Sequence, residues 1–252
     1  MSALPAVLSL RGVAHRYAGA TTATLQSLDL DLRTGEIVAV VGASGCGKTT
    51  LVRLLAGLDR PQAGRIALDG VPLDGPHPRI GVVFQEPRLL PWLTVAGNVG
   101  FGLDHLPRGA RAARVQAALE RVQLPGFGAR WPRELSGGQA QRVAIARALA
   151  VEPELILMDE PFSALDPATR GALQDHVAAL WGGSAGALLL VTHDVDEALV
   201  LADRVVVLAP QPGRIAATLA IDLPRPRRRA AAAFADHRRA LLDALARADR
   251  RC

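Results

Sequence analysis

Residues 42–51 of the chain read GASGCGKTTL and contain its single lysine, Lys48. The sequence has 29 lysine and arginine residues, so every other cationic side chain is an arginine. The stretch fits G-x-x-x-x-G-K-[ST], a pattern in which glycines turn backbone amides toward phosphates and the lysine reaches the β- and γ-phosphates. It follows an apolar run and opens a helical pattern, which is the context that such a phosphate-binding loop needs.

A compact ammonium group fits inside this ring of amides, whereas a broad planar guanidinium does not. The hydroxyl of Thr49 is expected to bind Mg²⁺. Cys46 lies between two glycines and is interpreted as a small loop residue rather than a redox centre. The residues predicted to bind the nucleoside triphosphate are Gly42, Ala43, Ser44, Gly45, Cys46, Gly47, Lys48, Thr49 and Thr50.

Polar residues follow three other apolar runs. ELILMDE ends in Asp159 and Glu160, RIGVVFQ ends in Gln85, and ALLLVTH ends in His193. Because the carboxyl ends of parallel strands lie at one edge of a sheet, these groups are expected to gather around the nucleotide. We predict that Asp159 holds Mg²⁺ and that Glu160 is the general base for the attacking water. For His193 the alternative is that it caps the helix beginning near Asp194.

A second stretch with the chemistry of an anion site is LSGGQ, at residues 135–139, directly before a helical pattern. Its small residues and the helix start would form another nest of amides. One bound nucleotide needs only one such nest of amides. The nucleotide at the phosphate loop therefore leaves this second nest without a function. The residues concerned are Ser136, Gly137, Gly138 and Gln139.

The elements that must position these residues alternate between strand and helix. Strands that are apolar on both faces belong to a covered, usually parallel sheet. Strict alternation at 28–33 instead predicts a half-buried strand of an antiparallel N-terminal sheet. Alternating strands and helices indicate an α/β core. The expected strands are 36–42, 79–85, 154–160, 187–193 and 204–209, and the expected helices are 48–57, 139–150, 167–181 and 194–201.

The chain is predicted to form an ATPase domain over residues 1–223 and a basic helical tail over 224–252. Residues 87–152 contain helical patterns and no good strand, so they are expected to be a helical subdomain inserted into the α/β core. The tail has nine arginines against three aspartates. It spaces Phe234, Leu241, Leu242 and Leu245 along one predicted helical face, which would pack on the ATPase body or lie near anionic lipid.

Composition excludes several classes of protein. The net charge of +5 is concentrated in the tail, which does not suit a nucleic-acid-binding domain with basic residues along one face. Two cysteines make neither a disulfide framework nor a metal site. No secretory leader is apparent, and no apolar run reaches the ~18–20 residues of a membrane-spanning helix, so a soluble cytoplasmic protein is expected.

Together these motifs resemble the ATP-binding subunit of ABC transporters, over almost the whole chain and in the family's order. The resemblance implies an α/β P-loop NTPase with a mostly parallel core sheet, an N-terminal antiparallel β subdomain and an inserted helical subdomain. It also implies a homodimer that sandwiches ATP and Mg²⁺. Each phosphate loop would then face the LSGGQ stretch of the other copy, which gives the second nest its role.

The resemblance assigns further roles by position. Tyr17 is expected to stack on adenine, and Gln85 to touch Mg²⁺ or water and to sense the membrane partner. His193 corresponds to the switch histidine that contacts the γ-phosphate and acts in catalysis with Glu160 and Lys48. The D-loop, expected at the dimer interface, corresponds to Ser163, Ala164, Leu165 and Asp166.

Three longer segments resemble the nitrate/sulfonate/taurine branch of importer ATPases. They are VVFQEPRLLPWLTVAGNV, THDVDEALVLADRVVVLAPQPGRI and IDLPRPRRR, the last being most similar to aliphatic sulfonate systems. The resemblance implies a peripheral subunit at the cytoplasmic face of the inner membrane, working with a permease of two subunits and an extracytoplasmic solute-binding protein. Leu89, Leu90 and Trp92 would contact the permease, or alternatively pack inside the helical subdomain. Taurine and nitrate are the alternative solutes.

Other nucleotide-binding classes fit less well. A GTPase would need a second lysine for its guanine-reading N-K-x-D element, and a metabolic kinase would not explain LSGGQ. A soluble ABC protein acting on nucleic acid or on ribosomes is the remote alternative. Such proteins usually have long coiled insertions or two cassettes in one chain, and neither is present here.

Overall fold

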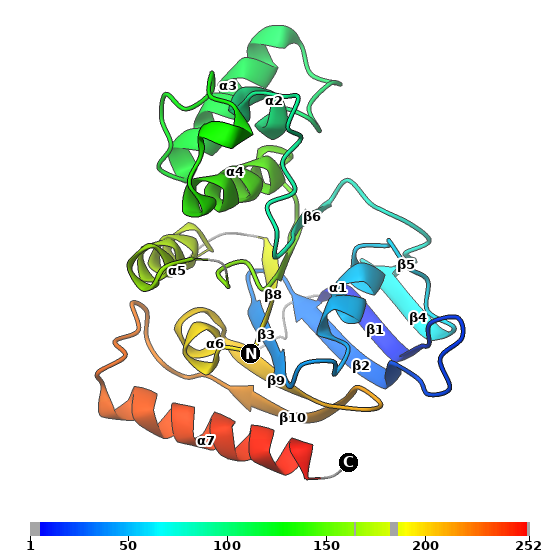
Figure 1. Cartoon of the computed structure of the whole chain (residues 1–252). Helices are drawn as coiled ribbons and strands as arrows, with labels where there is room; N and C mark the ends of the chain where they lie inside the picture. The colour runs from blue at the N-terminus through cyan, green and yellow to red at the C-terminus, as the bar shows by residue number, and fades with distance from the viewer. Residues whose placement is uncertain (1–5, 164, 182–185, 251–252) are drawn as a thin grey trace.

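The computed structural model describes residues 6–163, 165–181 and 186–250. Its backbone contains a four-stranded antiparallel sheet in the order β2-β1-β4-β5 and a six-stranded sheet in the order β10-β9-β3-β8-β7-β6 (Figure 1). In the second sheet every pair is parallel except β10–β9. The strands are β1 Ala6–His15, β2 Leu25–Arg33, β3 Ile37–Gly42, β4 Ala63–Leu68, β5 Val71–Pro72, β6 Ile80–Val83, β7 Leu155–Asp159, β8 Ala187–Thr192, β9 Arg204–Ala209 and β10 Arg214–Ala220.

These elements confirm the predicted α/β class with a mostly parallel core sheet and a separate antiparallel sheet. Strand β2 shows the expected alternation, because Leu28, Leu30 and Leu32 are buried while Asp29 and Arg33 are exposed. The helices are α1 Lys48–Leu55, α2 Val95–Val99, α3 Arg108–Arg121, the short 3₁₀ helix η1 Pro132–Glu134, α4 Gly137–Ala150, α5 Pro167–Trp181, α6 Val195–Leu201 and α7 Ala232–Asp249.

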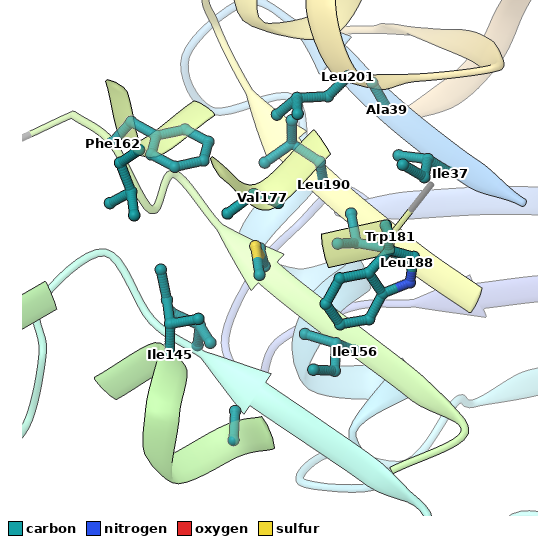
Figure 2. Packing of buried hydrophobic residues seen from close by; sticks show 14 of the residues in the cluster. Ile37, Ala39, Ile145, Ile156, Phe162, Val177, Trp181, Leu188, Leu190 and Leu201 are labelled. Atoms are coloured by element: carbon teal, nitrogen blue, oxygen red, sulfur yellow. The ribbon is translucent and has the colours of Figure 1, made fainter. Parts of the chain in front are cut away.

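Strand β3 is buried along its whole length and divides the core in two. Successive side chains of a strand point to opposite faces, so Ile37, Ala39 and Val41 pack in one cluster and Val38 and Val40 in the other. Helix α1 packs with the second cluster, next to the antiparallel sheet. Helices α4, α5 and α6 belong to the first cluster, part of which is drawn in Figure 2. Helices α1 and α4 therefore cover opposite faces of the six-stranded sheet.

The segment between β6 and β7 is helical, as predicted. Helices α2 and α3 pack on α4, which in turn lies against β6, and Figure 1 shows this group extending away from the two sheets. Residues Val115, Leu119, Val143 and Leu149 belong to the same buried cluster as the core strands. The helical group thus shares its hydrophobic core with the six-stranded sheet.

Helix α7 packs on the α/β core, against α6, β9 and β10, rather than standing apart from it. Phe234 and Leu241 are buried, but the prediction for Leu242 is wrong, because this side chain is 42% exposed. Each helical residue is turned by ~100° from the one before it, so the adjacent Leu242 leaves the buried face. Ala244 and Ala248 complete that face instead. Within the described ranges, no helix combines the length and apolar character needed to cross a membrane.

Candidate nucleotide site

The phosphate loop connects the end of β3 at Gly42 to the start of α1 at Lys48. Gly45 and Gly47 have φ angles of 80° and 98°, in the left-handed region where other residues are strained. Gly47 is the N-cap of α1, so the loop delivers its amides to the positive end of a helix. The strand–loop–helix context expected from GASGCGKTTL is present.

The ammonium group of Lys48 lies inside this loop, with the residue only 6% exposed. Its Nζ donates to the carbonyl oxygens of Gly42 at 2.8 Å and Ala43 at 3.0 Å. The third nearby acceptor is the Cys46 sulfur at 4.0 Å, which is weak. One N–H group of the ammonium is therefore only weakly engaged within the chain. Burial raises the pKa of the Cys46 thiol, which favours the protonated form and the interpretation of Cys46 as a small loop residue rather than a redox centre.

Asp159 and Thr49 form the part of the site suited to Mg²⁺. Asp159 ends β7 and is 5% exposed. Burial raises the pKa of its carboxyl group, a hydrogen bond with Thr49 opposes that shift, and the charge of Glu160 adds to it. A buried carboxylate beside a second carboxylate and a hydroxyl is stabilised by a divalent cation, and hard oxygen ligands are those that Mg²⁺ prefers. These residues therefore fit the predicted metal position.

Glu160 follows Asp159 in an uncommon backbone conformation, with a φ angle of 45°. Such a conformation costs a non-glycine residue energy and persists where the surroundings impose it. Its amide donates to the carbonyl of Val191 at 2.8 Å, and the Ser163 hydroxyl donates to its carbonyl at 3.0 Å. The carboxylate lies 3.2 Å from Nδ1 of His193. The structure thus brings the predicted general base and the predicted switch histidine into contact.

A network around the start of α6 fixes the position of His193. The Thr192 hydroxyl donates to the buried Glu197 carboxylate at 2.6 Å and accepts from the amide of Asp194 at 3.0 Å. Asp194 accepts from the amides of Asp196 and Glu197, so Asp194 is the N-cap of α6. The alternative in which His193 caps this helix is therefore wrong. Glu197 was not identified from the sequence as part of this network. Burial raises the pKa of the Glu197 carboxyl group.

Tyr17 lies beside the phosphate loop although 30 residues separate it from Gly47. Its hydroxyl is 3.1 Å from Oγ1 of Thr50, and its ring meets that of His15 edge-on at a centroid distance of 4.9 Å. The ring is partly exposed. An exposed aromatic face next to a phosphate loop offers a stacking surface for a purine.

Gln85 lies two residues beyond the end of β6, and its side chain is exposed. The connection that follows it is tied to α4. Gln141 donates to the carbonyl of Phe84 at 3.1 Å, and Arg147 donates to the carbonyls of Pro87 and Arg88, both at 2.9 Å. Burial lowers the pKa of Arg147. These two α4 residues were not predicted, since a helical pattern alone does not reveal what its polar residues bind.

The fully buried Asn98 holds the next part of this connection. Its side-chain amide donates to the carbonyls of Leu90, Leu93 and Thr94, each at 3.1 Å, and its carbonyl accepts from the amide of Leu90 at 2.7 Å. Trp92 lies within this fixed segment and is 69% exposed. Leu89 is partly buried against the large hydrophobic cluster that the helical group shares with the core sheet, while Trp92 is not part of that packing.

The LSGGQ stretch forms the start of α4. Ser136 is the N-cap, where its hydroxyl accepts from the amide of Gln139 at 3.3 Å while the Gln139 side chain accepts from the amide of Ser136 at 3.0 Å. Ser136 and Gly137 are exposed. Because α4 and α1 cover opposite faces of the sheet, this second nest does not join the phosphate loop of its own chain.

Three of the four D-loop residues lie just beyond Glu160, between β7 and α5. Leu165 is buried, and Asp166 accepts from the amide of Thr169 at 3.0 Å at the start of α5. Ser163 holds the Glu160 turn, as described above. The fourth predicted residue, Ala164, lies outside the described residues.

A phosphate loop, a buried aspartate, a glutamate and a histidine along one edge of a mostly parallel sheet define a P-loop nucleoside triphosphatase. The family model described as ABC transporter matches residues 25–163. The chain belongs to this family and is an ATPase of the ABC type. Solved structures agree with the fold. They include a dimeric ATP-binding cassette in a post-hydrolysis state with ADP and phosphate, which has a TM-score of 0.76 and 30% identity and covers 85% of this chain and 98% of its own.

Related proteins of known name align with this chain over most of their length. An aliphatic sulfonates import ATP-binding protein of Xanthomonas axonopodis pv. citri is 53% identical, over 89% of this chain and 91% of the relative. A taurine import ATP-binding protein of Pseudomonas putida is 47% identical, over 86% and 84% respectively. A subunit of the cbiONQ ABC transporter complex from Clostridium perfringens has a TM-score of 0.77 and 29% identity, and covers 85% of this chain and 88% of its own.

The Glu160→Gln variant tests the position of the general base. The amide preserves shape and removes the basic oxygen, so we expect ATP turnover to fall by about 10²–10⁴-fold, the scale for losing a general base. ATP binding, measured with a fluorescent nucleotide, should remain. Glu120→Gln, an exposed change on α3, is the matched control and should leave turnover unaltered. Normal hydrolysis by Glu160→Gln would show that another group activates the water.

Proposed function

We propose that the chain is the ATP-hydrolysing subunit of an ABC importer for a small organic sulfonate. The observation that supports it most is the 53% identity, over 89% of this chain, to a protein named for aliphatic sulfonate import. The subunit would lie at the cytoplasmic face of the inner membrane, peripheral to a two-subunit permease, and an extracytoplasmic binding protein would deliver the solute. Taurine is the second candidate, supported by 47% identity to a taurine import ATP-binding protein.

The catalytic unit would be a head-to-tail homodimer. A single chain presents its phosphate loop and its LSGGQ nest on different sides, and each is exposed to a second copy. In the dimer, Lys48 and the loop amides bind the phosphates of one ATP while the partner's LSGGQ stretch covers the γ-phosphate. Closure excludes water and strengthens each of these electrostatic contacts. The known dimeric cassette with ADP and phosphate supports this arrangement.

Hydrolysis then depends on Glu160 and His193. The carboxylate of Glu160 would accept a proton from the attacking water. The His193 ring, 3.2 Å from that carboxylate, would contact the γ-phosphate. Thr49, Asp159 and Gln85 would hold Mg²⁺, which neutralises charge on the β- and γ-phosphates when bound. Tyr17 would stack on adenine. When phosphate leaves, the contacts that hold the two copies together are lost and the dimer opens.

Trp92 is the candidate contact with the permease. A large aromatic side chain that is 69% exposed, on a segment held by Asn98 and Arg147, has the character of a binding hot spot. Leu90 lies beside it and is half-buried. The same segment is tied through Arg147 to α4, which begins at the LSGGQ nest. Movement of α4 during dimer closure would therefore pass to the segment that carries Trp92.

Mixed dimers test the composite site. Neither Ser136→Arg nor Lys48→Ala homodimers contain an intact site, but a heterodimer of the two contains one. An equal mixture should recover about one quarter of the wild-type rate, because half of the dimers then have one of two sites intact. Lys48→Ala mixed with Glu160→Gln is the control, since both changes damage the same half of the site. No recovery in the first mixture, at any ratio, would contradict the head-to-tail sandwich.

Trp92→Ala tests the permease contact. Removing a hot-spot aromatic should weaken ATP-driven uptake by about tenfold or more, while the ATPase rate of the isolated subunit stays the same. Uptake is measured in proteoliposomes and ATPase by phosphate release. Trp131→Ala is the matched control, because Trp131 is also exposed but lies outside the segment that Asn98 holds. Equal losses in uptake and isolated ATPase would indicate a packing role for Trp92.

The solute is tested with the complete transporter, in which this chain is reconstituted with its permease and its solute-binding protein. We expect ATP-dependent accumulation of labelled ethanesulfonate, abolished by Glu160→Gln, and a solute-stimulated ATPase rate. Taurine and nitrate are supplied separately at the same concentration. Preferred uptake of taurine would select the second candidate. Preferred uptake of nitrate, or no response to any of the three, would overturn the proposal of a sulfonate importer.

A further inference from the structure

A cavity of about 570 Å³ lies between α5, α6 and residues 225–229, which connect β10 to α7. Figure 1 shows this connection looping out beside α6. On the side of α5 and α6, it is lined by the small apolar side chains of Ala178, Ala179 and Val200, together with Asp175. None of the lining residues belongs to the nucleotide site. The volume is within the range of small-molecule sites, ~300–1,000 Å³.

The wall formed by residues 225–229 contains four arginines, two of which have a structural role. Arg225 donates to the carbonyl of Leu201 at 2.6 Å and forms an ion pair with Asp203 at 2.7 Å. Arg227, whose side chain is 1% exposed, donates to the carbonyls of Leu199 and Ala202. These are carbonyl groups at the C-terminal end of α6, where cations are favourable. Arg225 and Arg227 therefore anchor the connection to α6.

The other two arginines are not needed for that anchoring. Arg229 donates to the Gln174 side chain on α5 at 2.6 Å, which uses one of its five N–H groups. The Arg228 side chain makes no hydrogen bond or ion pair with any residue of the described ranges, and it lines the cavity. Arg228 and Arg229 thus present unused donors to the same space.

Positive charge in this wall exceeds the negative charge that faces it. The four arginines are opposed by Asp175 among the lining residues, and Asp203 is already paired with Arg225. Burial lowers the pKa of Arg227 to about 10, and repulsion from Arg225 contributes. An uncompensated cluster of guanidinium groups next to a cavity attracts an anion, and a guanidinium matches the geometry of an oxyanion.

We propose that this cavity binds a small organic oxyanion with a short aliphatic group. Arg228 and Arg229 bind the charged head, and Ala178, Ala179 and Val200 pack against the alkyl part. This site goes beyond the transport function, because it is separate from the nucleotide and does not require the permease. A bound anion would strengthen the tie between this connection and α5, which Arg229 and Gln174 already form.

Isothermal titration of the full chain with butanesulfonate tests the site, with saturating ADP and Mg²⁺ present to fill the phosphate loop. We expect binding of butanesulfonate, weaker binding of sulfate, which lacks the alkyl part, and none of butylammonium. Arg228→Ala should raise the Kd of butanesulfonate by about tenfold, the effect of losing one charged hydrogen bond. Arg247→Ala removes an exposed arginine from the same tail outside the cavity and should leave the Kd unchanged.

Ala179→Trp provides a second variant, because it fills the cavity from an exposed position on α5 and should abolish binding with the ATPase rate intact. The proposal is overturned if millimolar butanesulfonate does not bind in the presence of ADP, or if Arg228→Ala and Ala179→Trp bind it as wild type does. It is also overturned if sulfate binds as tightly as butanesulfonate. All of these outcomes are independent of which solute the transporter takes up.

Discussion

The burial of β3 on both faces is the constraint on which the rest of the structure depends. A strand without a polar face needs a neighbour on each edge and a packed layer on each side. Strands β8 and β9 supply the edges, and α1 and α4 lie in the two layers. The phosphate loop leaves the end of this strand, so its position is fixed by a fully buried element of the core. The same constraint separates the two amide nests, because each begins a helix on a different face.

Arginine side chains hold two of the connections around this core. Arg147 holds two carbonyls of the segment after Gln85, and Arg227 holds carbonyls at the end of α6. A guanidinium group is suited to binding several backbone carbonyl groups, because its planar arrangement of N–H groups can donate to several oxygens at once. The phosphate loop is the exception, where a narrow ring of backbone groups surrounds an ammonium. Arginine thus lies where several carbonyl groups are bound together, and lysine lies where the surrounding backbone leaves room only for an ammonium group.

The parts of the site that are short and contiguous could be predicted from the sequence, since local spacing alone defines them. The phosphate loop, Asp159, Glu160 and LSGGQ are of this kind, and so are the apolar core strands. Strand β1 was missed because Gly12, at a φ of 59°, and several register shifts interrupt its alternation. Asn98 and Arg147 were missed because their partners are backbone carbonyls that no sequence pattern marks. Leu242 was misplaced because a four-residue apolar face does not fix which neighbour turns outward.

The single lysine has a chemical consequence outside catalysis. Amine-directed reagents that label most proteins at many side chains have one such target here, and it is enclosed by the carbonyls of Gly42 and Ala43. Modification of a side-chain amine in this chain is therefore a direct measure of access to the phosphate loop. Because all other cationic side chains among the 29 lysines and arginines are arginines, a lysine-directed label reports on the phosphate loop alone.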